Sequence, residues 1–144
     1  MQSYWEMQEH FDVIPMDRQA YVEEVMDHYK NPRGKGKLEH ADFCAKDENP
    51  LCGDEISICA KVKAGKLQEI KFDGHGCAIC IASSSMLMEK ATGMKMEKAL
   101  KIKREDVLSN FGEISPVRTK CALLSLKVLK LGICSFLGKK APLE

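Results

Sequence analysis

The sequence lacks the features that define several large classes of protein. Lys and Arg number 22 against 21 for Asp and Glu, and a net charge of +1 gives no uniform field for nucleic acid. No apolar run approaches the length of a membrane span. The first residues carry acids where a signal peptide has a basic region, and no apolar run follows them. We therefore expect a cytoplasmic protein that binds neither nucleic acid nor a membrane.

Repeats, linkers and low-complexity segments are also absent. The 144 residues are enough for one domain with a real core and too few for two. The expected division is an N-terminal arm over residues 1–16, one domain over residues 17–132 and a C-terminal tail over residues 133–144. The charges are segregated, since the arm has three acids and no Lys or Arg, whereas residues 118–140 carry six basic residues and no acid.

The first half of the chain predicts one helix and a small sheet. An amphipathic helix is expected to start at Asp17 as its N-cap and to end near residue 31. A short extended piece, residues 38–45, is expected to lead into a polar loop, residues 46–53. Residues 55–63 alternate strictly between polar and apolar side chains, which predicts a strand with one buried face. A hairpin turn then leads into a return strand over residues 67–72.

The second half of the chain predicts helices. Residues 78–91 are apolar around most of the helix circumference, so this helix is expected to be central and buried. Two short helices fit residues 96–102 and 104–110. A last helix is expected to begin at Ser115 and to end at Gly132. The predicted fold class is α+β: a small antiparallel sheet of about three strands covered by helices.

Seven cysteines are the unusual part of the composition. An odd number in a chain without a leader indicates metal or redox chemistry in a reducing compartment rather than a disulfide framework. Cys52, Cys77 and Cys121 stand at the ends of predicted elements, where side chains can reach a ligand. Three isolated cysteines are interpreted as having no chemical role. They are Cys44, Cys59 and Cys134.

The neighbours of Cys52 and Cys77 suit a binding site. Cys52 lies among turn-forming residues, and Asp54 can add a carboxylate oxygen to the same site. Cys77 precedes a predicted helix, whose N-terminus lowers the pKa of a thiol. With Cys80 it forms a C-x-x-C motif, which also occurs in thiol-disulfide oxidoreductases and zinc ribbons. No βαβ pattern and no second C-x-x-C accompany it, and Cys80 is better interpreted as a core residue of the buried helix.

Cys121 has two interpretations. It lies on the apolar stripe of the last helix, and periodicity alone makes it a core cysteine. Nearby Arg118 and Lys120, together with the helix N-terminus, instead favour a thiolate. His75, between two glycines, is a candidate further ligand, although histidines in such loops are more often merely solvated.

Three ordered motifs resemble those of the U-type iron-sulfur cluster assembly scaffolds, the family of IscU, SufU and the N-terminal domain of NifU. NPLCGD at residues 49–54 matches the first cysteine loop of the family. FDGHGCAICIASSS at residues 72–85 matches the second, and KCA at residues 120–122 matches the third. The resemblance runs from about Tyr21 through Leu131. It implies a SufE/NifU-like fold and replaces the core interpretation of Cys121.

The resemblance also implies a cargo and its ligands. Cys52, Cys77 and Cys121 match the cysteines that hold a [2Fe-2S] cluster, and Asp54 is the candidate fourth ligand. The implied role is a scaffold that binds a nascent cluster and transfers it to apo-proteins, which makes the chain a carrier rather than an enzyme. A homodimer is expected when the cluster is bound.

A cysteine desulfurase is the implied source of sulfur. Cys121 is the candidate acceptor of persulfide sulfur, with Arg118 and Lys120 stabilising its thiolate. Lys120 stands where many IscU members have histidine, as in the SufU pattern, but the insertion typical of SufU is missing. The alternative function is therefore a sulfur acceptor that holds Zn²⁺ on the same residues and stimulates a desulfurase.

Overall fold

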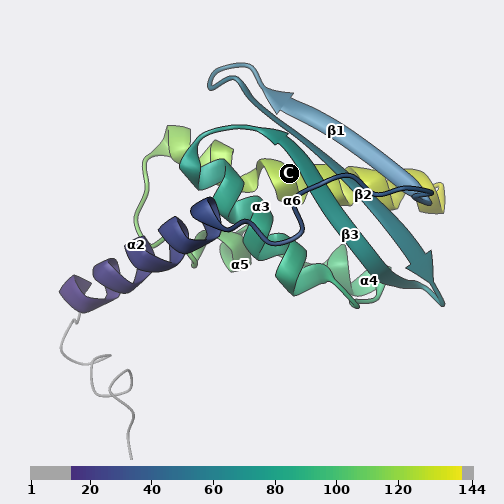
Figure 1. Cartoon of the computed structure of the whole chain (residues 1–144), viewed down its shortest axis with the longest axis horizontal. Helices are drawn as coiled ribbons and strands as arrows, with labels where there is room; N and C mark the ends of the chain where they lie inside the picture. Colours follow the sequence, from purple (N-terminus) through teal and green to yellow (C-terminus); the bar gives the residue numbers. More distant parts are fainter. Residues whose placement is uncertain (1–13, 141–144) are drawn as a thin grey trace, which may run out of the picture.

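The computed structural model describes residues 14–140, which form an α+β fold with helices on one face of an antiparallel sheet (Figure 1). Helices α3 (Ala78–Ala91) and α6 (Pro116–Leu137) pack against the sheet, and α2 (Ile14–Lys30) packs against α3. Two short helices, α4 (Met96–Ala99) and α5 (Arg104–Leu108), connect α3 to α6. The predicted fold class is confirmed. No helix among these residues is both long and apolar enough to cross a membrane.

The sheet has the strand order β1-β2-β3, and its bounds are Phe43–Asn49, Asp54–Lys63 and Lys66–His75. Along β2, every second side chain is buried beneath the helices while the alternate ones face outward. The predicted hairpin turn between β2 and β3 places Ala64 and Gly65 at positive φ, 53° and 75°. Two successive residues at positive φ match the twist of the flanking strands.

Strand β1 corrects the predicted polar loop over residues 46–53. Residues 46–49 belong to β1 and pair in register with residues 54–57 of β2. Their polarity misled the prediction because charged pairs hold the strand: Lys46 bonds Glu55 at 2.8 Å, and Asp47 bonds Lys127 of α6 at 2.8 Å. Only four residues remain between the two strands, and Cys52 is one of them.

The predicted end of the last helix at Gly132 is wrong. The helix continues to Leu137 and ends at Gly138, which has a left-handed φ of 73°. Gly132 serves close packing instead, since a Cβ atom there would lie 2.6 Å from Cε1 of Phe43 in β1. The first five residues of the expected tail are therefore helical, and Ile133 and Cys134 are buried.

Helix α2 begins earlier than predicted. It starts at Ile14 rather than after an N-cap at Asp17, and a proline at position 15 is compatible with the first turn of a helix. Residues 14–16 of the expected arm are therefore helical, while residues 1–13 lie outside the described residues. Buried His28 joins this helix to α3, because its Nδ1 lies 2.6 Å from Oγ of Ser85.

Candidate metal centre

The short turn between β1 and β2 presents Cys52. The backbone carbonyl of Asn49 accepts the N–H of Cys52 at 3.1 Å and the N–H of Gly53 at 2.8 Å. The side-chain oxygen of Asn49 accepts the N–H of Leu51 at 3.1 Å. The Asn49 amide also lies 3.6 Å from Sγ of Cys52. Gly53 closes the turn at a φ of 75°, a conformation that side chains disfavour. The thiol of Cys52 is thereby held at the end of the sheet, half-buried.

Asp54, the first residue of β2, joins this turn to the start of α3. Its carboxylate is 1% exposed, and Oδ1 accepts the N–H of Cys77, the N-cap residue of α3, at 3.0 Å. Gly76 allows this approach, since a Cβ atom there would lie 2.9 Å from the same oxygen. The second oxygen, Oδ2, is buried without a hydrogen-bond partner among the described residues. A buried carboxylate oxygen without a partner is costly unless a cation meets it.

Cys121 reaches the same point from α6. Its thiol is 1% exposed and lies 3.2 Å from Sγ of Cys52. The Oγ of Ser83 in α3 donates to the carbonyl of Ala122 at 2.5 Å, which fixes α3 and α6 beside this thiol. The ligand atoms of Cys52, Asp54 and Cys121 all lie within 4.8 Å of one another. Two segments 69 residues apart in the sequence, the β1–β2 turn with the start of β2 and helix α6, thus bring two sulfurs and a carboxylate together.

Cys77 lies at the edge of this group. It is half-buried at the N-cap of α3, and its thiol is close enough to Cys121 to influence it. Its backbone N–H is held by Asp54, whereas its sulfur is not among the three mutually close ligand atoms. Three of the four predicted ligand atoms therefore lie together, and the sulfur of Cys77 lies near them without joining the group.

The electrostatics of Cys121 differ from the prediction. Burial raises the pKa of its thiol well above the ordinary value, and neighbouring Asp54, Cys52 and Cys77 raise it further. Arg118 and Lys120 do not offset this effect because both side chains are exposed to solvent. The expectation that these cations would favour the free thiolate is therefore wrong. A metal ion would supply the missing positive charge and displace the proton.

The donor set fits such an ion. Thiolate sulfurs suit zinc and iron in iron-sulfur clusters, and a carboxylate is a harder, more weakly held ligand for iron of that kind. The oxygen of Asp54 that has no hydrogen-bond partner among the described residues is the observation that fits a bound cation. Cys52, Asp54, Cys77 and Cys121 are the residues that would hold it.

The remaining candidates are not among the three mutually close ligand atoms, although Cys80 lies next to them. The His75 imidazole is exposed at the end of β3, with Nε2 3.5 Å from the carboxylate of Glu55. Cys80 is fully buried in α3. Burial is the main cause that raises the pKa of its thiol, and the charges of Asp54, Cys77 and Cys52 raise it further. Cys134 is a buried core residue of α6.

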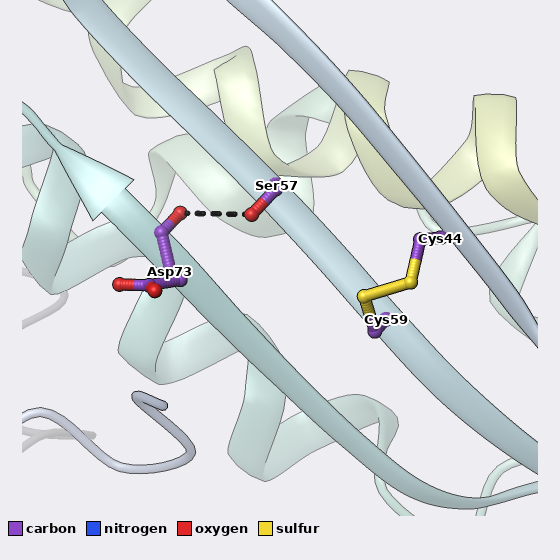
Figure 2. Close-up of a disulfide and its surroundings, with 4 residues drawn as sticks. All are labelled: Cys44, Ser57, Cys59 and Asp73. Atoms are coloured by element: carbon purple, nitrogen blue, oxygen red, sulfur yellow. Dashed lines mark hydrogen bonds between the residues drawn. A yellow bond between two sulfur atoms is a disulfide. The ribbon is translucent and has the colours of Figure 1, made fainter. Parts of the chain in front are cut away.

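Cys44 and Cys59 correct the interpretation that neither has a chemical role. They face each other across β1 and β2 and form a disulfide (Figure 2). The sequence did not reveal this pair because residues 46–53 were interpreted as a loop, which hid the register that places Cys44 opposite Cys59. The expectation that the cysteines serve metal or redox chemistry rather than disulfides is therefore incomplete.

Comparisons with known proteins agree with this arrangement. A family model described as the NifU-like N-terminal domain matches residues 20–142. The chain is 39% identical over 124 residues to the iron-sulfur cluster assembly scaffold protein IscU 1 of Archaeoglobus fulgidus, covering 86% of this chain and 81% of that protein. It is 36% identical over 131 residues to the zinc-dependent sulfurtransferase SufU of Bacillus subtilis, covering 78% of this chain and 88% of that one.

A solved structure shares the fold. It is the crystal structure of a candidate iron-sulfur cluster assembly scaffold protein for the SUF system from Fervidobacterium islandicum. The TM-score is 0.68 and the sequence identity 28%, covering 81% of this chain and 98% of that one.

Proposed function

This chain belongs to the family of NifU-like N-terminal domains, and on that premise we propose that it is a scaffold for iron-sulfur cluster assembly. Its cargo is a [2Fe-2S] cluster built from iron and desulfurase-derived sulfur and transferred to apo-proteins. The observation that carries the proposal is the convergence of Cys52, Asp54 and Cys121 within 4.8 Å, with an unpartnered carboxylate oxygen among them. In this role the chain is a carrier, not an enzyme.

The proposed ligands differ in how strongly they bind iron, which affects both retention and release of the cluster. Three thiolates, from Cys52, Cys77 and Cys121, bind iron strongly. The carboxylate of Asp54 binds iron of a sulfide cluster less strongly than a fourth thiolate would, which keeps one iron exchangeable. Cys52 and Cys77 are half-buried, so the cargo would lie near the surface, where an apo-protein can approach it.

Sulfur would arrive on Cys121. Once solvent reaches Cys121 and its thiol loses a proton, the thiolate attacks the outer sulfur of a desulfurase persulfide, the donor's S–S bond breaks, and the donor cysteine leaves as a thiolate. Because Cys121 is 1% exposed, the turn that carries Cys52 must move aside for this attack. Leu51 at the tip of that turn is 75% exposed and would meet the desulfurase first.

A basic hollow beside the centre suits the same partner. A cavity of about 340 Å³ between the β1–β2 turn and α6 is lined by apolar Pro50 and Leu123 and by the cations Arg104 and Lys120. Arg118 is exposed one turn before Cys121. In this arrangement Arg118 and Lys120 assist sulfur transfer by contacting the desulfurase and not by activating the buried thiol.

A second candidate function is a zinc-bound sulfur acceptor that stimulates a desulfurase. The specific observation in its favour is the compact donor set, which suits one tetrahedral ion as well as one iron of a cluster. The Bacillus subtilis relative is named a zinc-dependent sulfurtransferase. The missing insertion favours the cluster scaffold.

Metal and sulfide analysis separates the two functions. The chain is incubated anaerobically with ferrous iron, cysteine, a desulfurase and a dithiol that reduces persulfide sulfur to sulfide, freed of excess reagents, and analysed for iron, acid-labile sulfide and zinc. Equal amounts of iron and sulfide are the result expected for the scaffold. Zinc without sulfide would favour the second function. The matched control is Cys134→Ala, which removes a buried sulfur of α6 outside the centre and should load as the parent does.

A further inference from the structure

A second pair of cysteines lies on the face of the sheet opposite the helices. Phe43 and the apolar residues of β2 point toward the helices, so Cys44 and Cys59 point the other way. Cys44 is exposed and Cys59 half-buried, and Figure 2 shows their bond bridging the two strands. Small thiols in solution can therefore reach this disulfide. Exposed disulfides are the ones that exchange readily, whereas buried structural ones resist reduction.

The surroundings of the pair favour thiol-disulfide exchange. Register places Lys71 of β3 directly opposite Cys59, and Lys61 lies two residues further along β2 on the same face. Lysine side chains near a cysteine favour the thiolate, which is the attacking species in exchange. In the part of the chain that the structure describes, β1 pairs only with β2, which leaves the outer edge of the strand that carries Cys44 open.

The disulfide closes a covalent loop that contains two of the proposed metal ligands. Its cysteines are 15 positions apart, and the segment between them contains the turn with Cys52 as well as Asp54. With the bond formed, β1 cannot separate from β2 at this point, and the Cys52 turn is anchored on both sides. Without it, β1 is held by its backbone ladder, the Lys46–Glu55 and Asp47–Lys127 ion pairs and the packing of Phe43.

We propose that Cys44 and Cys59 form a reversible dithiol-disulfide site for low-molecular-weight thiols, and that its redox state sets how tightly the Cys52 turn holds metal. A small thiolate attacks one sulfur of the bond, forming a mixed disulfide and releasing one cysteine thiolate. A second small thiol then releases the other cysteine as the small disulfide forms. Two electrons pass from two small thiols to the protein, and reoxidation by the small disulfide reverses both steps.

The consequence concerns release rather than binding capacity. The ligands of the proposed function are present in both redox states, so each state should bind the same amount of metal. In the reduced state β1 opens more often, which exposes Cys52 and its bound metal to competing chelators. We expect metal to leave the reduced chain several-fold faster than the oxidised chain. This inference rests on the metal centre of the proposed function.

The test uses zinc, which also protects the ligand cysteines from oxidation. The full chain is loaded with one zinc ion and equilibrated anaerobically with reduced or oxidised glutathione. Peptide mass mapping reports the Cys44–Cys59 bond, and a chromogenic chelator reports the rate of zinc release. Amide hydrogen exchange over residues 43–49 reports the opening of β1. The matched control is the double variant C44S/C59S, which cannot form the bond.

The expected result is slower zinc release and stronger amide protection in the oxidised parent, with the double variant releasing zinc at the reduced rate in both buffers. Equal release rates for the oxidised and reduced parent would overturn the proposal. A Cys44–Cys59 bond that survives millimolar reduced glutathione would also overturn it. Failure of the chain to bind zinc or iron in either state would instead count against the metal centre itself.

Discussion

Asp54 has two roles that two substitutions can separate. One carboxylate oxygen accepts the Cys77 N–H, and the other has no hydrogen-bond partner within residues 14–140. We predict that Asp54→Ala lengthens the lifetime of a bound cluster and slows its transfer to apo-ferredoxin, because the exchangeable iron ligand is lost. Decay of the visible spectrum and the rate of holo-ferredoxin formation measure this.

Asp54→Asn is the matched variant, since it keeps an acceptor for the Cys77 N–H but removes the charge. It should share the slower transfer. Asp54→Ala should additionally lower the free energy of unfolding of the metal-free chain by about 1–3 kcal/mol relative to Asp54→Asn, because a buried N–H loses its partner. Unchanged lifetime and transfer in both variants would show that Asp54 is not a functional ligand.

The three proposed ligand cysteines should be individually essential. We predict that Cys52→Ala, Cys77→Ala and Cys121→Ser each abolish stable cluster binding, because the loss of one thiolate leaves an iron open to water and oxygen. Anaerobic reconstitution followed by visible absorption checks each variant, with Cys134→Ala as the control that should retain its spectrum. A full spectrum after loss of Cys52 or Cys77 would contradict the assignment.

At the residue scale, the sequence was informative wherever a motif accompanied a cysteine. Loop composition and the family resemblance predict Cys52, Cys77 and Cys121 as ligands, and the fold brings the sulfurs of Cys52 and Cys121 together with the carboxylate of Asp54. Periodicity alone predicts the burial of Cys121 correctly, but it does not indicate that the thiol faces Cys52 and Asp54, because such a thiol lies on the same stripe as core leucines. The raised pKa of that thiol depends on its burial, which sequence neighbours do not determine.

Helix α6 offers a test of close packing at the scale of elements. At an exposed position of a helix, a change from glycine to alanine would stabilise the chain, because alanine is the better helix former by about 1 kcal/mol. Here a Cβ atom would lie 2.6 Å from the ring of Phe43, so we predict destabilisation of about 1–3 kcal/mol through overpacking. Urea unfolding measures it. The control is Ser135→Ala on the exposed face of the same helix, for which we expect little change in the free energy of unfolding. A Gly132→Ala chain that is more stable than the parent would refute the packing argument.

The elements with a strict hydrophobic period were predicted well. The alternation along β2, the glycine turn after it and the apolar run of α3 each predict the element that the structure contains. β1 was shortened in the prediction because its second half is polar on both faces, and ion pairs with β2 and α6 hold it. The end of α6 was misplaced because a glycine that admits an aromatic ring looks in sequence like a glycine that ends a helix.

The arrangement of the whole molecule leaves the centre near the surface. Leu51 is 75% exposed and Val117 55% exposed, one beside Cys52 and the other at the start of α6. We predict that the cluster-loaded chain is a dimer and the metal-free chain monomeric or mixed, because a second subunit would cover a cluster that oxygen attacks. Anaerobic light scattering of both forms measures it. A holo-protein that remains monomeric at micromolar concentration, with its cluster intact, would show that one chain protects the site.

The acidic arm predicted over residues 1–16 suggests how such a dimer could form, since residues 118–140 carry the opposite charge. Removing residues 1–13, which lie outside the described part of the chain, should weaken the holo dimer without lowering the iron content per chain. Raising the ionic strength should have the same effect if charge attraction holds the subunits together.

Direct cluster transfer is the measurement that tests the scaffold function most directly. The reconstituted chain is mixed anaerobically with apo-ferredoxin in the presence of an iron chelator that captures any free iron, and holo-ferredoxin is followed by circular dichroism. A scaffold that transfers an intact [2Fe-2S] cluster predicts that holo-ferredoxin forms at the same rate with and without the chelator. If the chelator abolishes holo-ferredoxin formation, or if the cluster never leaves the chain, the scaffold function is contradicted.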